Sequence, residues 1–323
     1  MGIPNLNRFL MEKCSKQSIQ KKNLSCFSGK TIVIDTSIYL YQFTGENSLI
    51  EHMYLLISIF KYYDITPLFV FDGKPPDEKK DVLLQRKIEK KDAIKKHDEL
   101  QKKLETLSSE QNEKYMEEKT EIMNELLVLK KKMIRIREDD ILKVKQLMEL
   151  YGITYYNAPG EADKLCAQLV ITKVAWACLS DDMDMFVYGC TRVMRHISLL
   201  NHTVIFYNIN GILRELQIPM KHFREIMVIS GTDYNSNDDT TLNDTLQFYN
   251  TYKNEPANSE LTDSFCEWLH KNTQYIKNID SLRSIYKMFD LSNSEKCNAT
   301  QEIHNMNREK MVDFLKPYGF IFV

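Results

Sequence analysis

The stretch Thr31-Ile32-Val33-Ile34-Asp35 places a carboxylate directly after a run of β-branched residues. Such a run predicts a short buried strand. The same pattern returns at Leu68–Phe71, which Asp72 follows, and helices are expected in between at Ile38–Phe43 and Leu49–Tyr63. Continuous apolar strands that alternate with helices are typical of a parallel sheet covered on both faces. We therefore expect an α/β fold with a mainly parallel central sheet flanked by helices.

The alternation of strands and helices resumes in the second half of the chain. Strands are expected at Ile153–Asn157, Val174–Leu179 and Val204–Tyr207, with a helix at Glu161–Ile171. From Gly211 onward the sequence predicts mostly helix. We therefore expect one α/β domain over residues 1–235 and a helical C-terminal region over residues 236–323.

A charged segment interrupts the α/β pattern between Asp77 and Arg137. It contains 17 Lys and Arg against 14 Asp and Glu, and it has no Gly or Pro. We expect two long helices here, broken near Ser108-Ser109 and inserted into the α/β domain. Taken alone, such a segment is typical of a solvated helical hairpin.

Composition excludes several classes of protein. The 43 Lys and Arg against 45 Asp and Glu leave a net charge of −2, so affinity for a polyanion must come from a local patch. The 10 glycines never stand close enough for a Gly-rich phosphate loop, which excludes the P-loop and the dinucleotide fingerprint. The seven cysteines form no CxxC pair, a pattern that indicates reduced, intracellular thiols. No apolar stretch approaches the length of a membrane span.

Acidic residues follow the predicted strands or begin the predicted helices. Parallel strands share one C-terminal edge, where ligands bind in this class of fold. Seven carboxylates from five segments are expected near that edge: Asp35, Asp72, Glu161, Asp163, Asp182, Asp184 and Asp233. Each alone could cap a helix or belong to a turn. Gathered at one edge, the carboxylates repel one another, and a bound divalent cation is the simplest way to hold them together. A set of ligands made only of oxygen atoms selects a hard ion such as Mg²⁺ or Mn²⁺.

Seven motifs resemble the flap endonuclease family of structure-specific 5′ nucleases, within the PIN-like nuclease superfamily. They are Met1-Gly2-Ile3-Pro4-Asn5-Leu6, Ile34-Asp35-Thr36-Ser37, Tyr41-Gln42-Phe43, Val70-Phe71-Asp72-Gly73-Lys74-Pro75-Pro76, Ala158-Pro159-Gly160-Glu161-Ala162-Asp163, Asp182-Met183-Asp184 and Gly231-Thr232-Asp233-Tyr234. The motifs stand in family order over about residues 1–235, and beyond that the similarity is weak.

The resemblance implies two metal sites and a reaction. Asp35, Asp72, Glu161 and Asp163 would hold the first ion, with the other three acids around the second. The implied cofactor is a pair of Mg²⁺ ions, which Mn²⁺ can replace. The implied reaction is phosphodiester hydrolysis that leaves a 5′ phosphate.

The resemblance also assigns the charged insertion, over about residues 77–137. It would be the helical arch over the active site, through which a single-stranded 5′ end passes. Lys79 and Arg86 match two basic arch residues that reach the scissile phosphate, and their spacing of seven places them on one helix face. Lys131 and Lys132 match a basic pair on the far side of the arch, which would steer the flap.

Two further DNA contacts are implied by the resemblance. Tyr41 matches an aromatic residue on which a base near the cleavage site stacks. The alternative for Tyr41 is core packing in an amphipathic helix. Gly2, after removal of Met1, would place a free amine near the site.

The chain departs from the family pattern at four places. Asp163 stands where a second Glu is usual, so its carboxylate is one methylene shorter. Only 29 residues separate Gln42 from Asp72, which shortens the part that would split the duplex. Asn235–Asp244 has no glycine and three acids where the family has a duplex-binding Gly-x-Gly turn. The C-terminus lacks a sliding-clamp motif.

These observations predict a metal-dependent nuclease that cuts DNA at 5′ flaps or 5′ ends in replication, repair or recombination. An enzymatic alternative is a 5′→3′ exonuclease on DNA or RNA. A second alternative is a catalytically silent nucleic-acid-binding protein. The expected partner is DNA with a 5′ flap or a single-stranded 5′ end, bound by a monomer, and no membrane is expected as a partner. The expected compartment is intracellular and reducing.

Overall fold

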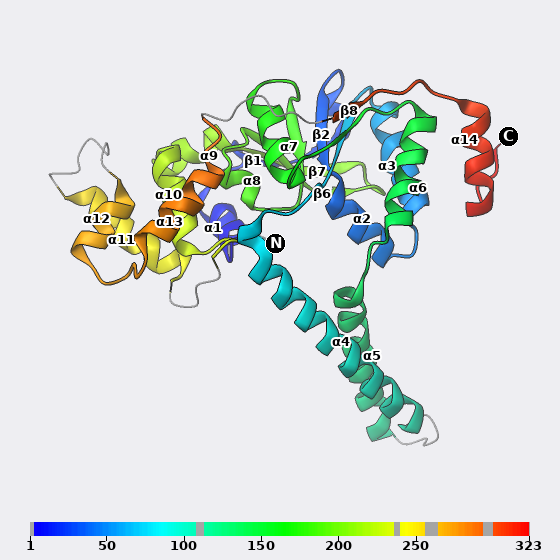
Figure 1. Ribbon diagram of the computed structural model, residues 1–323, viewed down its shortest axis with the longest axis horizontal. Helices are drawn as coiled ribbons and strands as arrows, with labels where there is room; N and C mark the ends of the chain where they lie inside the picture. Colours follow the sequence, from blue (N-terminus) through cyan, green and yellow to red (C-terminus); the bar gives the residue numbers. More distant parts are fainter. Residues whose placement is uncertain (1–2, 108–112, 236–239, 256–263, 293–299, 323) are drawn as a thin grey trace.

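A computed structural model describes residues 3–107, 113–235, 240–255, 264–292 and 300–322 (Figure 1). These residues form an eight-stranded sheet with the strand order β1-β7-β6-β5-β2-β3-β4-β8. The strands are β1 (Ile19–Asn23), β2 (Thr31–Asp35), β3 (Thr66–Phe71), β4 (Tyr155–Asn157), β5 (Ala177–Leu179), β6 (Arg192–Ser198), β7 (Thr203–Asn208) and β8 (Thr300–Glu302).

The five central strands confirm the predicted parallel sheet. Strands β6, β5, β2, β3 and β4 run parallel to one another, whereas β7, β1 and β8 pair antiparallel toward the two edges. The chain leaves the central strand β2 toward β3 on one side and later toward β5 on the other, which makes β2 and β5 the switch point of the sheet. The C-terminal ends of these strands therefore meet at one edge.

Helices cover both faces of the sheet, as the alternation predicted. Side chains along β2 alternate between the two faces, so both faces of the sheet are apolar and must be covered. Val33 packs into one hydrophobic core, whereas Ile32 and Ile34 pack into the other. The helices of the first core are α1 (Leu6–Lys13), α7 (Ala162–Ile171), α8 (Asp184–Val187), α9 (Ile209–Leu216) and α10 (Met220–Ser230). The helices of the second core are α2 (Thr36–Gly45), α3 (Leu49–Tyr62), α6 (Glu138–Tyr151) and α14 (Arg308–Leu315).

The charged insertion forms two long helices that project from the body of the molecule (Figure 1). A short 3₁₀ turn, η2 (Asp77–Lys79), leads into α4 (Lys80–Leu107), and α5 (Glu113–Met133) returns to the body. The two predicted helices are confirmed, and the predicted break at Ser108-Ser109 lies outside the described residues. Lys103 pairs with Glu118 at 2.6 Å across the two helices. We call this segment, residues 77–137, the arch.

The region after residue 240 divides between the two faces. Helices α11 (Leu242–Asn254), α12 (Phe265–Asn272) and α13 (Ile279–Phe289) pack around α10 in the first core. Strand β8 then joins the sheet beside β4, and α14 packs on α6 in the second core. The predicted boundary between residues 1–235 and 236–323 stays a prediction. No helix in the described residues is both long and apolar enough to span a membrane.

Candidate active site

A pocket of about 1030 Å³ lies between the base of the arch and the C-terminal ends of the central strands. Six of the seven predicted acids line it, namely Asp35, Asp72, Glu161, Asp163, Asp182 and Asp233. The seventh, Asp184, is only 2% exposed and stands two residues after Asp182. The structure thus gathers acids from five separate segments at one edge of the sheet.

The ends of regular elements place these acids. Asp35 is the last residue of β2, and Asp72 directly follows β3. Glu161 stands at the N-cap of α7, with Asp163 in its first turn. The loops that carry Asp72 and Glu161 run side by side, because the Gly73 amide donates to the Gly160 carbonyl at 2.7 Å.

Gly73 is required for that close approach of the two loops. A Cβ at this position would collide with the backbone carbonyls of Ala158 and Pro159. Any side chain would therefore push the Asp72 loop away from the Glu161 loop and open the pocket.

Burial sets the electrostatics of the acids. Together with the neighbouring Glu161 and Asp182 carboxylates, it raises the pKa of Asp163 to about 8. The pKa of Asp35 lies well above its usual value for the same reason, with Asp72 as the strongest charged neighbour. Burial and Asp182 likewise raise the pKa of Asp184. Without a cation, the folded protein favours the protonated form of these groups.

Two cations from the base of the arch reach into the pocket. The buried Lys79 ammonium donates to Glu161 Oε1 and lies 3.8 Å from Asp233 Oδ2. The Arg86 guanidinium donates to the same Asp233 oxygen at 2.7 Å. Lys79 lies in η2 and Arg86 in α4, so the two residues do not share one helix, but their side chains meet at one carboxylate.

Protein donors also engage the remaining acids. The Ser37 hydroxyl and the Ala162 amide donate to Asp72, the latter at 2.7 Å. The Ser180 hydroxyl donates to Asp35 at 3.1 Å. In contrast, Asp184 Oδ1 is buried with no hydrogen-bond partner among the described residues.

These residues fit a divalent cation by their chemistry. The donors are all carboxylate oxygens, which suit a hard ion, and the unpartnered Asp184 oxygen lacks a positive group. As the side chains stand, no group of three Asp, Glu, His or Cys within the described ranges could hold an ion. Glu161 and Asp233 instead pair with Lys79 and Arg86.

The other predicted site residues fall into two groups. Tyr41, Lys131 and Lys132 line the same pocket. Tyr41 is 53% exposed, so the alternative of core packing is wrong. Gly2 lies outside the described residues, so its predicted contact with DNA stays a prediction.

The duplex-binding turn of the family has a different counterpart here. The Thr241 hydroxyl caps α11 by accepting from the Asp244 amide at 3.2 Å. The same hydroxyl donates to the Asp244 carboxylate, so an acid already stands at this helix N-terminus. Residues 236–239 lie outside the described part of the chain.

Sequence reasoning missed several residues that shape the pocket. Ser37 and Tyr234 lie within the motifs but received no role, yet both donate to predicted metal ligands. Lys90 donates to the Ile134 carbonyl at 2.6 Å and ties the two legs of the arch together at their base. Ser37 and Tyr234 could have been recognised from sequence, because each carries a hydroxyl within two positions of a predicted metal ligand.

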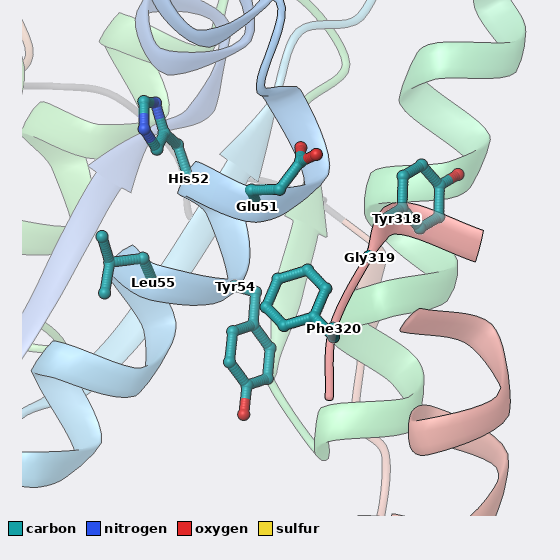
Figure 2. Close-up of a pocket in the computed structure, with 7 residues that line it drawn as sticks. All are labelled: Glu51, His52, Tyr54, Leu55, Tyr318, Gly319 and Phe320. Atoms are coloured by element: carbon teal, nitrogen blue, oxygen red, sulfur yellow. The ribbon is translucent and has the colours of Figure 1, made fainter. Parts of the chain in front are cut away.

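A second, smaller pocket of about 350 Å³ lies between α3 and the C-terminal residues. Figure 2 shows the rings of Tyr54 and Phe320 side by side there, and their centroids are 4.9 Å apart. None of the predicted site residues lines this pocket.

Two family models match the chain, and together they cover more than half of it. The XPG N-terminal domain matches residues 1–93, and the XPG I-region matches residues 152–233. The matched ranges contain all seven acids together with Lys79, Arg86 and Tyr41.

Similar proteins share the sequence pattern and the fold. Flap endonuclease 1-A of Oryza sativa subsp. japonica is 30% identical over 253 residues, which is 72% of this chain and 62% of that relative. The chain thus spans about three fifths of the length of the curated relatives it matches.

Solved structures extend the similarity of the fold. The catalytic core of Rad2 in complex with DNA substrate has a TM-score of 0.67 at 20% identity, covering 98% of this chain and 95% of that one. The Holliday junction-resolving enzyme GEN1, in complex with product DNA and Mg²⁺, has a TM-score of 0.52 at 17% identity, with 98% and 69% covered.

Proposed function

Because this chain belongs to the flap endonuclease family of 5′ nucleases, we propose that it hydrolyses DNA phosphodiesters at 5′ flaps or single-stranded 5′ ends. The observation that carries the proposal is one pocket in which six of the seven predicted acids meet the arch cations Lys79 and Arg86. A protein that only bound nucleic acid would gain nothing from like charges facing the phosphates.

The family is metal-dependent, and the acids divide into two proposed ion sites. Asp35, Asp72, Glu161 and Asp163 would hold one ion, and Asp182, Asp184 and Asp233 would surround another. Bound Mg²⁺ would supply a hydroxide nucleophile and offset the charge of the leaving oxygen, which leaves a 5′ phosphate on the product. The count of two ions is part of the proposal.

The arch cations would orient the scissile phosphate. Lys79 pairs with Glu161, and Arg86 pairs with Asp233. Both cations therefore lie beside proposed metal ligands, where the scissile phosphate would bind. An Arg guanidinium can bind two phosphate oxygens at once, which fixes the direction of attack. Lys79 would supply a single, closely placed positive charge.

The mouth of the pocket offers contacts for a single strand. Tyr41 presents an exposed ring on which a base could stack. Lys131 and Lys132 stand on the opposite leg of the arch and would attract the phosphate backbone between the legs.

A panel of labelled substrates tests the proposal. Purified protein with Mg²⁺ should cut a 5′-flap DNA near the junction, and EDTA should abolish the cut. Release of mononucleotides from a recessed 5′ end, without an internal cut, would favour the exonuclease. Faster cleavage of an RNA flap than of the DNA flap would overturn the choice of DNA. Tight binding without turnover across Mg²⁺ and Mn²⁺ would contradict the proposal and favour the silent binder.

A further inference from the structure

The Glu161 carboxylate accepts a hydrogen bond at each of its two oxygens. Lys79 donates to its Oε1 atom, and the Tyr234 hydroxyl donates to its Oε2 atom. Glu161 stands at the N-cap of α7 but makes no capping hydrogen bond with its side chain. The orientation of this carboxylate in the pocket therefore depends on Lys79 and Tyr234 rather than on its own helix.

Tyr234 is well suited to hold that carboxylate in place. It directly follows Asp233, so two successive residues of one loop flank the Lys79 ammonium. The Lys79 Nζ atom lies 5.3 Å from the centre of the Tyr234 ring, within the range of a cation–π contact. The phenol thus contacts both partners of the Lys79–Glu161 pair.

The ring of Tyr234 is seated on a helix from the C-terminal region. Phe289, the last residue of α13, is fully buried and contacts Tyr234 edge-on, with 5.4 Å between the ring centroids. The same Phe289 ring lies 4.8 Å from that of Tyr188, which directly follows α8. Helix α13 therefore supports the two segments that carry Asp184 and Asp233.

An ion pair fixes the position of the C-terminal end of α13. Asp290 lies 3.2 Å from Arg224, and the Arg224 Nε atom donates at 2.9 Å to the carbonyl of Val187, the last residue of α8. The end of α13 is thus attached to the pocket by an aromatic contact and by a buried polar link.

We propose that Tyr234 and Phe289 form a positioning pair that fixes the Glu161 carboxylate for a divalent ion. Hydrogen bonds behind a metal ligand set its orientation, and their loss lowers metal affinity about tenfold or more. Through this pair, α13 contributes to the geometry of the site, although it lies in the C-terminal region, where the similarity to the family is weak. This inference rests on the proposed function.

The test measures ion binding without DNA, so it does not depend on turnover. Mn²⁺ is titrated into the full chain by calorimetry, comparing wild type with Tyr234→Phe. The matched control is Tyr63→Phe, which removes a hydroxyl bonded to His202 at 2.9 Å outside the pocket. Tyr234→Phe should weaken Mn²⁺ binding about tenfold, and Tyr63→Phe should leave it within twofold.

A second pair of variants tests the role of α13. Phe289→Leu keeps an apolar side chain but loses the aromatic edge, and it should weaken Mn²⁺ binding about threefold. Phe265→Leu, a buried aromatic of α12 in the same core, should lower thermal stability without changing Mn²⁺ affinity. Equal loss of Mn²⁺ affinity in both variants would overturn the assignment of Phe289.

Cleavage supplies a further readout and separates this inference from the proposed function. With Tyr234→Phe, kcat at limiting Mn²⁺ should fall and recover in excess Mn²⁺, whereas KM for DNA should not change. Wild-type affinity for Mn²⁺ in Tyr234→Phe overturns the inference even where DNA is cut. If wild type binds Mn²⁺ but cuts no DNA, the proposed function fails and the titration still decides the inference. Wild type that takes up no Mn²⁺ overturns the inference as well.

Discussion

Asp163 shows how a single residue couples the pocket to folding. It is 9% exposed and has a shorter side chain than the Glu usual in the family. Burial, followed by Glu161 and Asp182, raises its pKa to about 8, and the Lys79 charge only partly opposes this. Burial disfavours the charged form of this carboxylate, so protonation or a facing cation stabilises it.

The first prediction follows from that raised pKa. Between the unfolded pKa near 4 and the folded value of about 8, the folded chain binds a proton that the unfolded chain does not. Stability of the metal-free protein should therefore fall as the pH rises through this window. Thermal melts in EDTA from pH 5.5 to 8.5 measure it, with roughly 2–4 °C expected for every kcal/mol lost.

The matched variants identify the residue responsible. Asp163→Asn removes the titrating group, so its melting temperature should depend less on pH than that of wild type. Asp139→Asn, an exposed acid that pairs with Lys143 on α6, should follow wild type. A melting temperature that rises with pH in EDTA would contradict the account.

The positions of single site residues could be predicted from sequence where a neighbouring strand or helix fixes them. Six of the seven acids follow strands or begin helices, so their convergence needs only the topology of a parallel sheet, whereas Asp233 follows the helix α10. The partners were not predictable in this way. Tyr234 reaches Glu161 from 73 positions away, and Phe289 supports it from a helix with no motif at all. Such contacts depend on packing between segments that the sequence does not order in space.

At the scale of elements, three polar contacts hold the base of the arch. They are Lys79 with Glu161, Arg86 with Asp233, and Lys90 with the Ile134 carbonyl. Two of the three end on predicted metal ligands. The arch is therefore attached most firmly when no ion competes for Glu161 and Asp233.

The second prediction concerns this attachment. Arg86→Ala should speed amide hydrogen exchange at residues 80–90 by roughly threefold to tenfold, the factor that about 1 kcal/mol of lost attachment gives. Mn²⁺ added to wild type without DNA should act in the same direction. Lys103→Ala breaks a pair farther along the arch and should leave exchange at residues 80–90 unchanged. Equal exchange in wild type and Arg86→Ala would refute the attachment.

The elements also show which strands the sequence patterns predicted and which they missed. Four of the five central strands, β2, β3, β4 and β5, and the long arch helices were predicted correctly, because their apolar runs and the lack of Gly and Pro in the arch are strong signals. Strands β1, β6 and β8 were missed. The segments of β1 and β8, Ile19–Asn23 and Thr300–Glu302, are rich in polar residues and lie at the two edges of the sheet.

At the scale of the whole molecule, the near-neutral charge conceals a sorting of charges. Most of the seven predicted acids meet in one pocket, which basic residues from both legs of the arch also line. Two hydrophobic cores hold the sheet between them, and both receive helices from beyond residue 240. The weakly similar C-terminal region is thus integrated into the fold that carries the pocket.

The most direct test compares Asp182→Asn with the matched control Asp181→Asn on one labelled 5′-flap DNA in Mg²⁺. Asp182 lines the pocket, whereas its neighbour Asp181 accepts a hydrogen bond from the His196 amide at 2.7 Å and does not line it. Binding and the rate of product formation are measured on the same preparations.

Asp182→Asn should bind the flap within about threefold of wild type and cut at least about a thousandfold more slowly, the scale of loss when a group that acts in the transition state is removed. Asp181→Asn should cut at a rate close to wild type. Wild-type cleavage by Asp182→Asn, or cleavage by wild type that persists in EDTA, would contradict a metal-dependent nuclease centred on this pocket.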